Sequence, residues 1–364
     1  MGVTLSALHW TYLIFVLLII WFIVMRKDTS FICIAGILVL GFIATSSATQ
    51  SITGIFNSFA YAIKELLGTI LVISIIFGMS RILMKTGINE EMVLPFTRLI
   101  RTPALAYWTI GILMMLISFF FWPSPAVALM GAVLLPVALR AKLPALGVAV
   151  AMNLFGHGIA LSGDFIIQGA PKLTADGAGI PVGDVIAASV PLVIVMGIVT
   201  TVTAFWLLKR DIKLGVLKVD ELERSKKSEI KTEDEILHMR DIPSNVRKAL
   251  AALVPILFAI DLIIMYTAKL QGGDATALIG GTSMLILIII SFFGYKANPL
   301  ERITDHLIEG LQFGFKVFGP VIPIAAFFYL GDSAIGSIFG EVLPAGSQGL
   351  VNDLGIALAE IVPL

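Results

Sequence analysis

The chain has 364 residues, of which 58% are hydrophobic and 14% charged, and its formal net charge at pH 7 is zero. Soluble domains contain roughly 45–50% apolar and ~25% charged residues, so this composition excludes an ordinary soluble protein. Several apolar runs approach the roughly 20 residues that a helix needs to cross a bilayer, and none shows the ~10-residue alternation typical of a membrane barrel. The sequence therefore predicts an all-α, polytopic membrane protein, with the lipid bilayer as a partner and no nucleic-acid partner.

The N-terminal region carries two simple signals. The only cysteine, Cys33, lies in an apolar run, which excludes an internal disulfide and a thiolate metal cluster, so we interpret it as part of the packing. The first apolar run begins near His9 without a positively charged segment or a small-residue cleavage site before it. This run is therefore predicted to be a retained helix rather than a cleaved signal peptide.

Lysine and arginine are distributed asymmetrically around the first apolar run. Arg26 and Lys27 directly follow the run from about His9 to Met25, whereas the segment before it contains neither residue type. Because loops rich in Lys and Arg stay on the cytoplasmic side, the N-terminus is predicted to lie outside.

Three elements are predicted between residues 31 and 83. A second span, at about 31–44, returns the chain to an external loop that lacks positive charge. An amphipathic helix at 52–65 would then lie in the membrane interface. It leads into a third span at about 67–83, which ends inside at Arg81 and Lys85.

A re-entrant hairpin is predicted for about residues 98–142. Its two apolar arms meet at the sequence Trp-Pro-Ser-Pro, residues Trp122 to Pro125, and positive residues flank both outer ends. This charge pattern places both ends on the cytoplasmic side, and the prolines on each side of Ser124 would break the helix at the tip. A broken tip is tolerated at membrane depth where protein or a watery cavity satisfies the backbone. The alternative is two full crossings joined by an ordinary proline turn.

The region from Asn153 to Pro171 reads NLFGHGIALSGDFIIQGAP and mixes polar residues with glycines inside apolar surroundings. Its glycines would let the helix predicted at about 145–171 break and turn backbone groups toward a ligand, as in secondary transporters. Polar groups are costly in hydrocarbon unless they face a partner, a cavity or an ion, so ionisable residues there are candidates for function. The polar side chains of this region are Asn153, His157, Ser162, Asp164 and Gln168.

A charged linker divides the chain into two predicted transmembrane repeats, residues 1–208 and 249–364. The linker, residues 209–248, holds 11 of the 25 lysines and arginines together with many acids, and is predicted to be cytoplasmic. The elements of the second half follow the same order as at the start of the chain, with spans and one amphipathic segment at about 249–268, 278–293, 299–312 and 313–330. The second half would begin inside, so the two repeats are predicted to be inverted, an architecture of many secondary transporters.

The repeat also predicts that the second half is incomplete. A shift of 251 residues aligns Gly68 with Gly319 at the same place in the order of elements. The first repeat covers 202 residues (9–210), whereas the second has 116 (249–364). We therefore expect a natural version to continue for about 86 further residues, 202 − 116, and the final segment of this chain to be poorly anchored.

The order of these features resembles the ion transporter superfamily, and within it the gluconate permeases and the C4-dicarboxylate uptake carriers. The resemblance rests on the span LGTILVISIIFGMSRILMKTGI, the hairpin arm FFFWPSPAVALMGAVLLPVALRAK and the segment GHGIALSGDFIIQGAP, and it covers roughly residues 30–210. It implies a carrier of small organic anions in a bacterial cytoplasmic membrane, driven by H⁺ or Na⁺, without another cofactor and often paired as a homodimer. The stretch LSGDFIIQGAP replaces a pattern rich in histidine and proline in the gluconate carriers, which argues against gluconate itself.

The resemblance and the polar side chains together define a candidate site. The candidate substrate-binding residues are Ser124, Asn153, His157, Ser162 and Gln168. Asp164 is the ion-coupling candidate, able to carry a proton or to bind Na⁺, and its alternative is a structural aspartate at a helix end or in an external loop. His157 could relay protons or be a structural histidine bonded to a carbonyl. Asp261, a lone acid in a later span, could be a second coupling group or the partner of an unidentified residue.

The sequence also bears on several other functions. It lacks the His-Glu-x-x-His motif of zinc proteases, the Walker A motif of ATP-driven pumps and the Gly-x-Ser-x-Gly motif of serine hydrolases, so no catalytic or metal-ligating residue is predicted. The predicted function is an ion-coupled secondary transporter of a small organic anion such as a carboxylate, and not an enzyme. The alternatives are a cation/proton antiporter of the same superfamily, a membrane-embedded enzyme that uses His157 and Asp164 as an acid/base pair, and a non-transporting scaffold or receptor.

Overall fold

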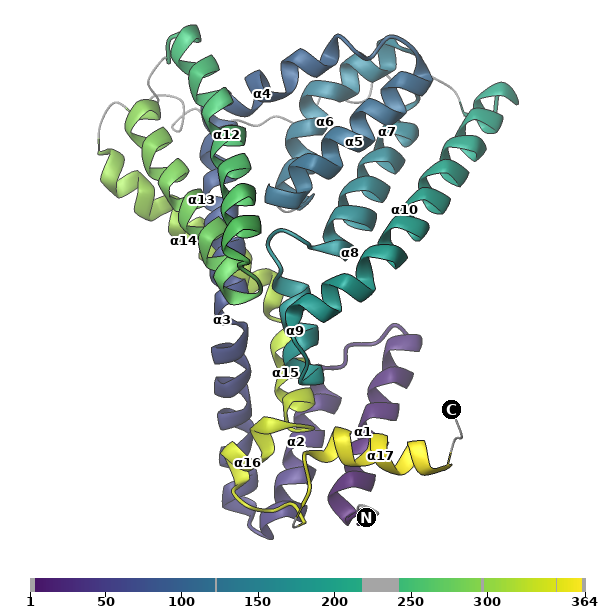
Figure 1. Ribbon diagram of the computed structural model, residues 1–364, viewed down its shortest axis with the longest axis vertical. Helices are drawn as coiled ribbons and strands as arrows, with labels where there is room; N and C mark the ends of the chain where they lie inside the picture. Colours follow the sequence, from purple (N-terminus) through teal and green to yellow (C-terminus); the bar gives the residue numbers. More distant parts are fainter. Residues whose placement is uncertain (1–3, 122, 218–241, 296–297, 345, 362–364) are drawn as a thin grey trace. The chain divides into compact units, whose positions relative to one another are not determined.

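Figure 1 shows a computed structural model of the chain, which describes residues 4–121, 123–217, 242–295, 298–344 and 346–361. The elements in these ranges are helices, which confirms the predicted all-α fold. Seven of them are long and apolar enough to cross a membrane, and the bent pair α14 (Pro299–Phe318) and α15 (Val321–Tyr329) would make an eighth span. The chain is therefore a polytopic membrane protein. Trp122 of the predicted hairpin tip and residues 218–241 of the predicted linker lie outside the described residues.

The chain divides into two compact units. The terminal unit contains residues 1–67 and 315–364, and the central unit contains residues 68–314. The terminal unit thus joins elements from both ends of the sequence, so the compact units do not coincide with the two predicted repeats. The repeats concern a correspondence between the two sequence halves, and they stay a prediction.

The terminal unit is built from short and medium apolar helices. Its described elements are α1 (Ala7–Val24), α2 (Ser30–Thr45), the first part of α3 (Ala48–Thr86), α15 (Val321–Tyr329), α16 (Ser333–Phe339) and α17 (Leu350–Ile361). The Tyr12 and Phe327 rings stack at 5.1 Å between centroids, which joins α1 to α15. Cys33 on α2 is fully buried in the same core as a free thiol, which confirms its interpretation as a packing residue.

Glycines allow α2 to approach its neighbours closely. A Cβ at Gly36 would lie 2.7 Å from the Phe327 ring, and a Cβ at Gly41 would lie 2.9 Å from the Phe339 ring. Gly54 on α3 meets the same Phe339 ring, at 2.4 Å. Small residues at helix contacts are typical of membrane proteins, in which close packing replaces the hydrophobic effect between helices.

The last helix, α17, corrects the expectation that the final segment is poorly anchored. The backbone N–H of Val351 donates to the Gly331 carbonyl at 2.9 Å, and Leu350 is fully buried in the core of the terminal unit. Asp353 forms a buried contact with His9 on α1, 344 residues away in sequence. The expectation was wrong because it considered only where the apolar spans end, whereas a long-range polar contact holds this helix.

The central unit contains the remaining helices. After the second part of α3, its described elements are α4 (Ile88–Thr97), α5 (Pro103–Phe121), α6 (Pro123–Arg140), α7 (Ala145–Met152), η1 (Asn153–Ala160), α8 (Leu161–Gly163), α9 (Gly169–Ala178), α10 (Val182–Lys213), α12 (Ser244–Ala268), α13 (Gly273–Gly294) and most of α14 (Pro299–Phe318). An aromatic cluster joins three of these elements: Tyr107 and Trp108 on α5, Phe155 on η1 and Phe205 on α10. The Tyr107 hydroxyl also donates to the Thr201 carbonyl of α10 at 2.9 Å.

Helix α3 differs from its prediction. The sequence predicted an interfacial helix at 52–65 and a separate span at 67–83, whereas the structure has one helix of 39 residues, Ala48–Thr86. At about 1.5 Å per residue this helix is about 58 Å long, so only part of it can lie in a hydrocarbon core ~30 Å thick. Gly68 is followed by Thr69 rather than by proline, and a lone glycine does not break a helix of this length.

The corresponding region of the second half is bent. α14 runs to Phe318, beyond the predicted boundary at 312, and α15 begins at Val321 after a bend of 59°. Pro320 lies at the break, where its missing N–H and its ring interrupt the helical hydrogen bonds. Gly319, the residue that aligns with Gly68, therefore lies in a different backbone environment from its counterpart.

Helices α3 and α14 pack with their backbones close together inside the central unit. Gly310 and Gly314 form a Gly-x-x-x-Gly pair on α14, and a Cβ at Gly310 would lie 2.1 Å from the Ser74 carbonyl oxygen of α3. The Phe77 and Phe313 rings stack at 4.0 Å between centroids. Such a contact depends on glycine, because any side chain would separate the helices.

Helices α5 and α6 form an antiparallel pair at the predicted hairpin. The Phe120 and Phe121 rings at the end of α5 lie 5.0 and 5.6 Å from the Phe258 ring of α12. Arg247, near the start of α12, pairs with Glu91 of α4 at 3.1 Å. Phe258 lies 11 residues further along α12, a rise of about 17 Å. The end of α5 thus contacts the middle of a candidate span, and the re-entrant geometry itself stays a prediction.

Candidate functional site

The glycine-rich region that contains most of the predicted site residues begins with a π-helix. α7, η1 and α8 form one candidate span, Ala145–Gly163, in which residues 153–160 adopt the π-helical turn. π-helices are rare and are frequent at functional sites because they re-aim side chains within a helix. The structure therefore modifies the prediction of a simple unwound helix: the glycine-rich stretch first widens and then breaks.

Helix α5 holds the π-helix in place. A Cβ at Gly111 would lie 2.5 Å from the Phe155 ring, and a Cβ at Gly156 would lie 2.8 Å from Met114 and 3.1 Å from Ser118 Oγ. Both contacts need glycine, because a side chain would push the helices apart. The predicted hairpin arm thus supports the candidate site directly.

The break begins at Asp164, which is 5% exposed and has a left-handed backbone, with φ 42°. Its Oδ2 accepts a hydrogen bond from the backbone N–H of Ala170 at 2.8 Å, at the start of α9. A carboxylate is stabilised there by the free N–H groups and positive end of the helix dipole. Asp164 is therefore a helix-end aspartate, and it is buried rather than exposed in a loop.

Gln168 closes the break and ties it to α13. Its backbone is also left-handed, with φ 60°, and its N–H donates to the Asp164 carbonyl at 2.9 Å. The side-chain Oε1 accepts a hydrogen bond from the Gly272 N–H at 2.6 Å, and Nε2 donates to the Phe165 carbonyl at 3.1 Å. These contacts give Gln168 a structural role, and its predicted contact with substrate stays a prediction.

Two threonines complete the surroundings of the break, and the sequence analysis missed both. Thr276 on α13 donates to the Ile167 carbonyl at 2.6 Å. Thr69 on α3 lies beside Gly169, where an added Cβ would meet Thr69 Cγ2 at 2.8 Å and Asp164 Oδ2 at 3.4 Å. Threonine is ordinary inside membrane helices, so only the three-dimensional contact distinguishes these two.

The other predicted site residues are less closely associated with Asp164. His157 is half-buried on η1, and its buried Nδ1 has no hydrogen-bond partner among the described residues. Asn153 and Ser162 are exposed, and the Ser162 hydroxyl approaches the His157 carbonyl only at 3.5 Å. Ser124 lies in the first turn of α6, and its side chain is not among the parts that the structure describes. Among the described residues no hydrogen bond or ion pair joins any of these side chains to Asp164.

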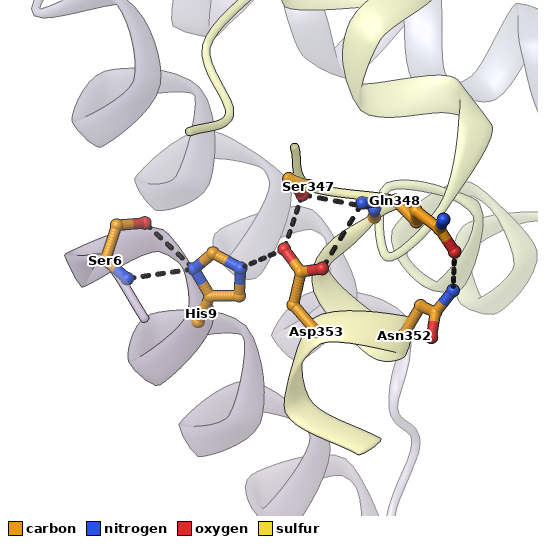
Figure 2. Close-up of polar contacts among 7 residues, drawn as sticks. Ser6, His9, Ser347, Gln348, Asn352 and Asp353 are labelled. Carbon is orange, nitrogen blue, oxygen red and sulfur yellow. Dashed lines mark hydrogen bonds and ion pairs between the residues drawn. The ribbon is translucent and has the colours of Figure 1, made fainter. Parts of the chain in front are cut away.

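Figure 2 shows a second polar cluster, in the terminal unit, that includes serine, histidine and aspartate. His9 Nδ1 accepts a hydrogen bond from the Ser6 N–H at 3.0 Å, so Nε2 carries the proton and donates to Asp353 Oδ2 at 3.0 Å. The Ser347 hydroxyl and the Gln348 N–H also donate to this carboxylate.

His9 Nδ1 also lies 2.9 Å from the Ser6 hydroxyl oxygen, so the contacts run in the order serine, histidine, aspartate, as in a hydrolytic triad. The same Nδ1 accepts the Ser6 backbone N–H at the start of α1, and the imidazole is fully buried, which favours a structural role for the contact. The cluster joins α1 to α17. Among the described residues no group of three or more His, Cys, Asp or Glu side chains could hold a metal ion.

The fold and the buried polar break define an integral, all-α membrane protein. The chain is 53% identical over 365 residues to the uncharacterized membrane protein YhfA of Bacillus subtilis (strain 168), in a match that covers 100% of this chain and 77% of that protein. The chain belongs to the same family as this protein. No family model and no solved structure matches it. The similarity confirms the predicted integral membrane location.

Proposed function

We propose that the chain is an ion-coupled secondary transporter of a small organic anion such as a carboxylate, and not an enzyme. The observation that carries the proposal is the buried carboxylate of Asp164 at the break between α8 and α9. Helices broken near the middle of the membrane form substrate and ion sites in secondary transporters, since their free ends present N–H and carbonyl groups. The resemblance to the ion transporter superfamily supports the same proposal.

Asp164 is the coupling residue of this proposal. Its carboxylate is held by the N-terminus of α9, and Thr69 and Gly169 lie beside it. A carboxyl group in this position can take up a proton or a small cation and release it when the surroundings change, which would link substrate movement to an ion gradient. His157 and Ser162 on the preceding turns are the proposed substrate contacts.

The contact between the hairpin and α12 supports a site at membrane depth. Phe121, at the end of α5, packs on Phe258 in the middle of α12, so Ser124 on the next turn would lie near the same level. A broken helix tip aims N–H groups outward, and such groups bind carboxylates. Ser124 is accordingly proposed as a substrate contact from the hairpin side.

A cation/proton antiporter is the second candidate. It is favoured by one observation: the described contacts of Asp164 and Gln168 include no Lys or Arg side chain that would bind an organic anion. The nearby Lys172 pairs instead with Asp176 on the same helix, at 2.5 Å. In this case Asp164 would bind the transported cation and the proton in turn.

The two candidates are separated by one screen on purified protein. Thermal unfolding would be followed with a panel of small mono- and dicarboxylates, each with and without Na⁺. A ligand that binds only the folded state raises the apparent stability, by about 2.7 kcal/mol at 100 times its Kd. Stabilisation by a carboxylate supports the anion carrier, stabilisation by Na⁺ alone supports the antiporter, and uptake of the stabilising solute into liposomes in unchanged form excludes an enzymatic conversion.

A further inference from the structure

A second buried carboxylate lies in the central unit, on α12. Asp261 on α12 is 3% exposed, and its Oδ1 accepts a hydrogen bond from the Thr282 hydroxyl of α13 at 2.9 Å. Its Oδ2 is buried and has no hydrogen-bond partner among the described residues. Thr282 is thus the partner that the sequence analysis left unidentified, and it satisfies only one of the two oxygens.

A carboxylate oxygen without a hydrogen-bond partner raises the free energy of the folded protein in this position. Both α12 and α13 are long and apolar enough to cross the membrane, so Asp261 and Thr282 belong to candidate spans. An ionised carboxylate in such surroundings needs several compensating donors, and a single hydroxyl supplies one. A proton on Oδ2 removes the charge and turns the unpaired acceptor into an O–H group.

No charged side chain of the described residues compensates Asp261. On α12, Arg247 pairs with Glu91 near one end, 14 residues away, and Lys269 follows the other end. On α13 the only described acid is Asp274, in the exposed first turn. Na⁺ would need several oxygen ligands, as hard cations do, whereas in the part of the chain that the structure describes Thr282 is the only side chain hydrogen-bonded to Asp261. A proton therefore fits this site better than a metal ion.

The pair lies close to the elements that form the candidate site. Asp261 follows Phe258 by one helical turn, and Phe258 contacts the end of the hairpin arm α5. Thr282 follows Thr276 by six residues on α13, a rise of about 9 Å, and Thr276 bonds the Ile167 carbonyl within the break. α13 therefore connects the Asp261 carboxyl to the region of Asp164.

We propose that Asp261 is a proton-binding site, held by Thr282, which gains a proton from water and returns it during each transport cycle. Binding transfers a proton from a hydronium ion to Oδ2, which forms an O–H bond and leaves a water molecule, and release is the reverse transfer. The gain and release of this proton in each transport cycle, its cyclic role, rests on the proposed transporter function, whereas proton binding itself does not. The site would make H⁺ a coupling ion of this chain.

Proton occupancy can be measured without a substrate. An apolar carbodiimide reacts with protonated carboxyl groups: the carboxyl proton moves to a carbodiimide nitrogen, and the carboxyl oxygen bonds to the central carbon. The purified full chain would be treated at a series of pH values, and the modified peptides would be quantified by mass spectrometry. We expect Asp261 to be modified at low pH and progressively less as pH rises, with Na⁺ having no effect and Asp261→Asn removing the signal.

Two variants of Thr282 test the geometry. Thr282→Val removes the donor to Oδ1, so modification of Asp261 should persist to a higher pH, by about one unit, because the charged form loses its hydrogen bond. Thr282→Ser keeps the hydroxyl and should restore the wild-type pH dependence. If modification of Asp261 has the same pH dependence in Thr282→Val as in the wild type, the hydrogen bond from Thr282 does not affect proton binding at Asp261.

Transport by Asp261→Asn tests the cyclic role. Asparagine has the same shape and its oxygen can accept the Thr282 bond, but it cannot ionise. We expect uptake driven by a pH gradient to fall at least tenfold while exchange of substrate across the membrane is kept, and the exposed Asp274→Asn to behave as wild type. Uptake by Asp261→Asn that still follows the pH gradient would overturn the proposal, as would modification of Asp261 that is absent at every pH or is prevented by Na⁺. If the wild type moves no carboxylate at all, the proposal of an anion carrier fails, and the carbodiimide result still decides whether Asp261 binds a proton.

Discussion

The side-chain oxygen of Gln168 accepts a hydrogen bond from the backbone N–H of Gly272, 104 residues further along the chain, at 2.6 Å. This bond holds the break after α8 against the start of α13. The same amide group also donates to the Phe165 carbonyl, so one side chain satisfies a carbonyl of the break and an N–H at the start of α13. Gln168 therefore holds the backbone that follows Asp164, together with the Ala170 N–H and the Thr276 hydroxyl.

The first prediction concerns this contact. Gln168→Leu would leave the buried Gly272 N–H unpaired, at a cost of about 1–3 kcal/mol, and would also remove the part-buried bond to the Phe165 carbonyl. We expect a lower temperature of unfolding and faster hydrogen exchange in residues 164–170. Gln271→Leu, at an exposed neighbouring position, is the matched control. Equal stability of the two variants would show that the Gln168 bonds contribute little.

The second prediction concerns the packing of α3 against α14. Gly310→Ala would place a methyl group 2.1 Å from the Ser74 carbonyl oxygen, so the helices must separate, which we expect to destabilise the protein by about 1–3 kcal/mol. Gly281→Ala is the control, because an added Cβ there meets no atom within 4 Å. Thermal unfolding in detergent measures both, and a Gly310→Ala protein as stable as the control would contradict the observed close approach.

The third prediction is a pH dependence of the contact between α1 and α17. Burial opposes ionisation of Asp353, but hydrogen bonds from Ser347, His9 and Gln348 outweigh it and lower the pKa of this carboxyl below its usual range. A lowered pKa in the folded state adds stability above the unfolded-state pKa, near 3.9, and this stability is lost as pH falls through the folded-state value.

The variant Asp353→Asn tests the direction in which stability changes with pH. We expect the variant to be less stable than the wild type at neutral pH, by about 1–2 kcal/mol from weaker hydrogen bonds to a neutral group, and the difference to shrink below about pH 4. Glu341→Gln, at an exposed position in the same unit, should change stability little at either pH. A difference between Asp353→Asn and wild type that is the same at both pH values would rule out an ionised Asp353 as its source.

The fourth prediction concerns topology. In a Cys33→Ala background, a cysteine at position 124 should not react with a membrane-impermeant thiol reagent added from outside, because both ends of the hairpin are predicted to be cytoplasmic. A cysteine at position 230, in the predicted linker, should react only from the inside. External reaction at position 124 would show that the hairpin is instead two full crossings.

Local features of the sequence predicted the class of fold and the place of the break. Hydropathy and length are properties of each segment, so the spans were visible without tertiary information. The break was predicted by the glycines that precede Asp164, since glycine lowers the cost of leaving the helix. The two left-handed residues that complete the break, Asp164 and Gln168, are of types whose positive φ values depend on the surrounding contacts.

Contacts between distant residues could not be predicted in the same way. Gly68 and Gly319 occupy corresponding places in the sequence, yet α3 is continuous and α14 ends at a bend, because only Gly319 is followed by proline. The bond from His9 to Asp353 spans 344 residues and joins residue types that are ordinary near helix ends. A single sequence contains no signal that pairs such residues.

The central claim is that the carboxylate of Asp164 couples an ion gradient to transport. Asp164→Asn keeps an oxygen that can accept the Ala170 N–H bond, so folding and membrane insertion should be retained. The exposed Asp176→Asn is the matched control. The decisive measurement is uptake of a stabilising carboxylate into liposomes under an imposed H⁺ or Na⁺ gradient. We expect uptake to be lost in Asp164→Asn and kept in Asp176→Asn, and normal gradient-driven uptake by Asp164→Asn would contradict the account.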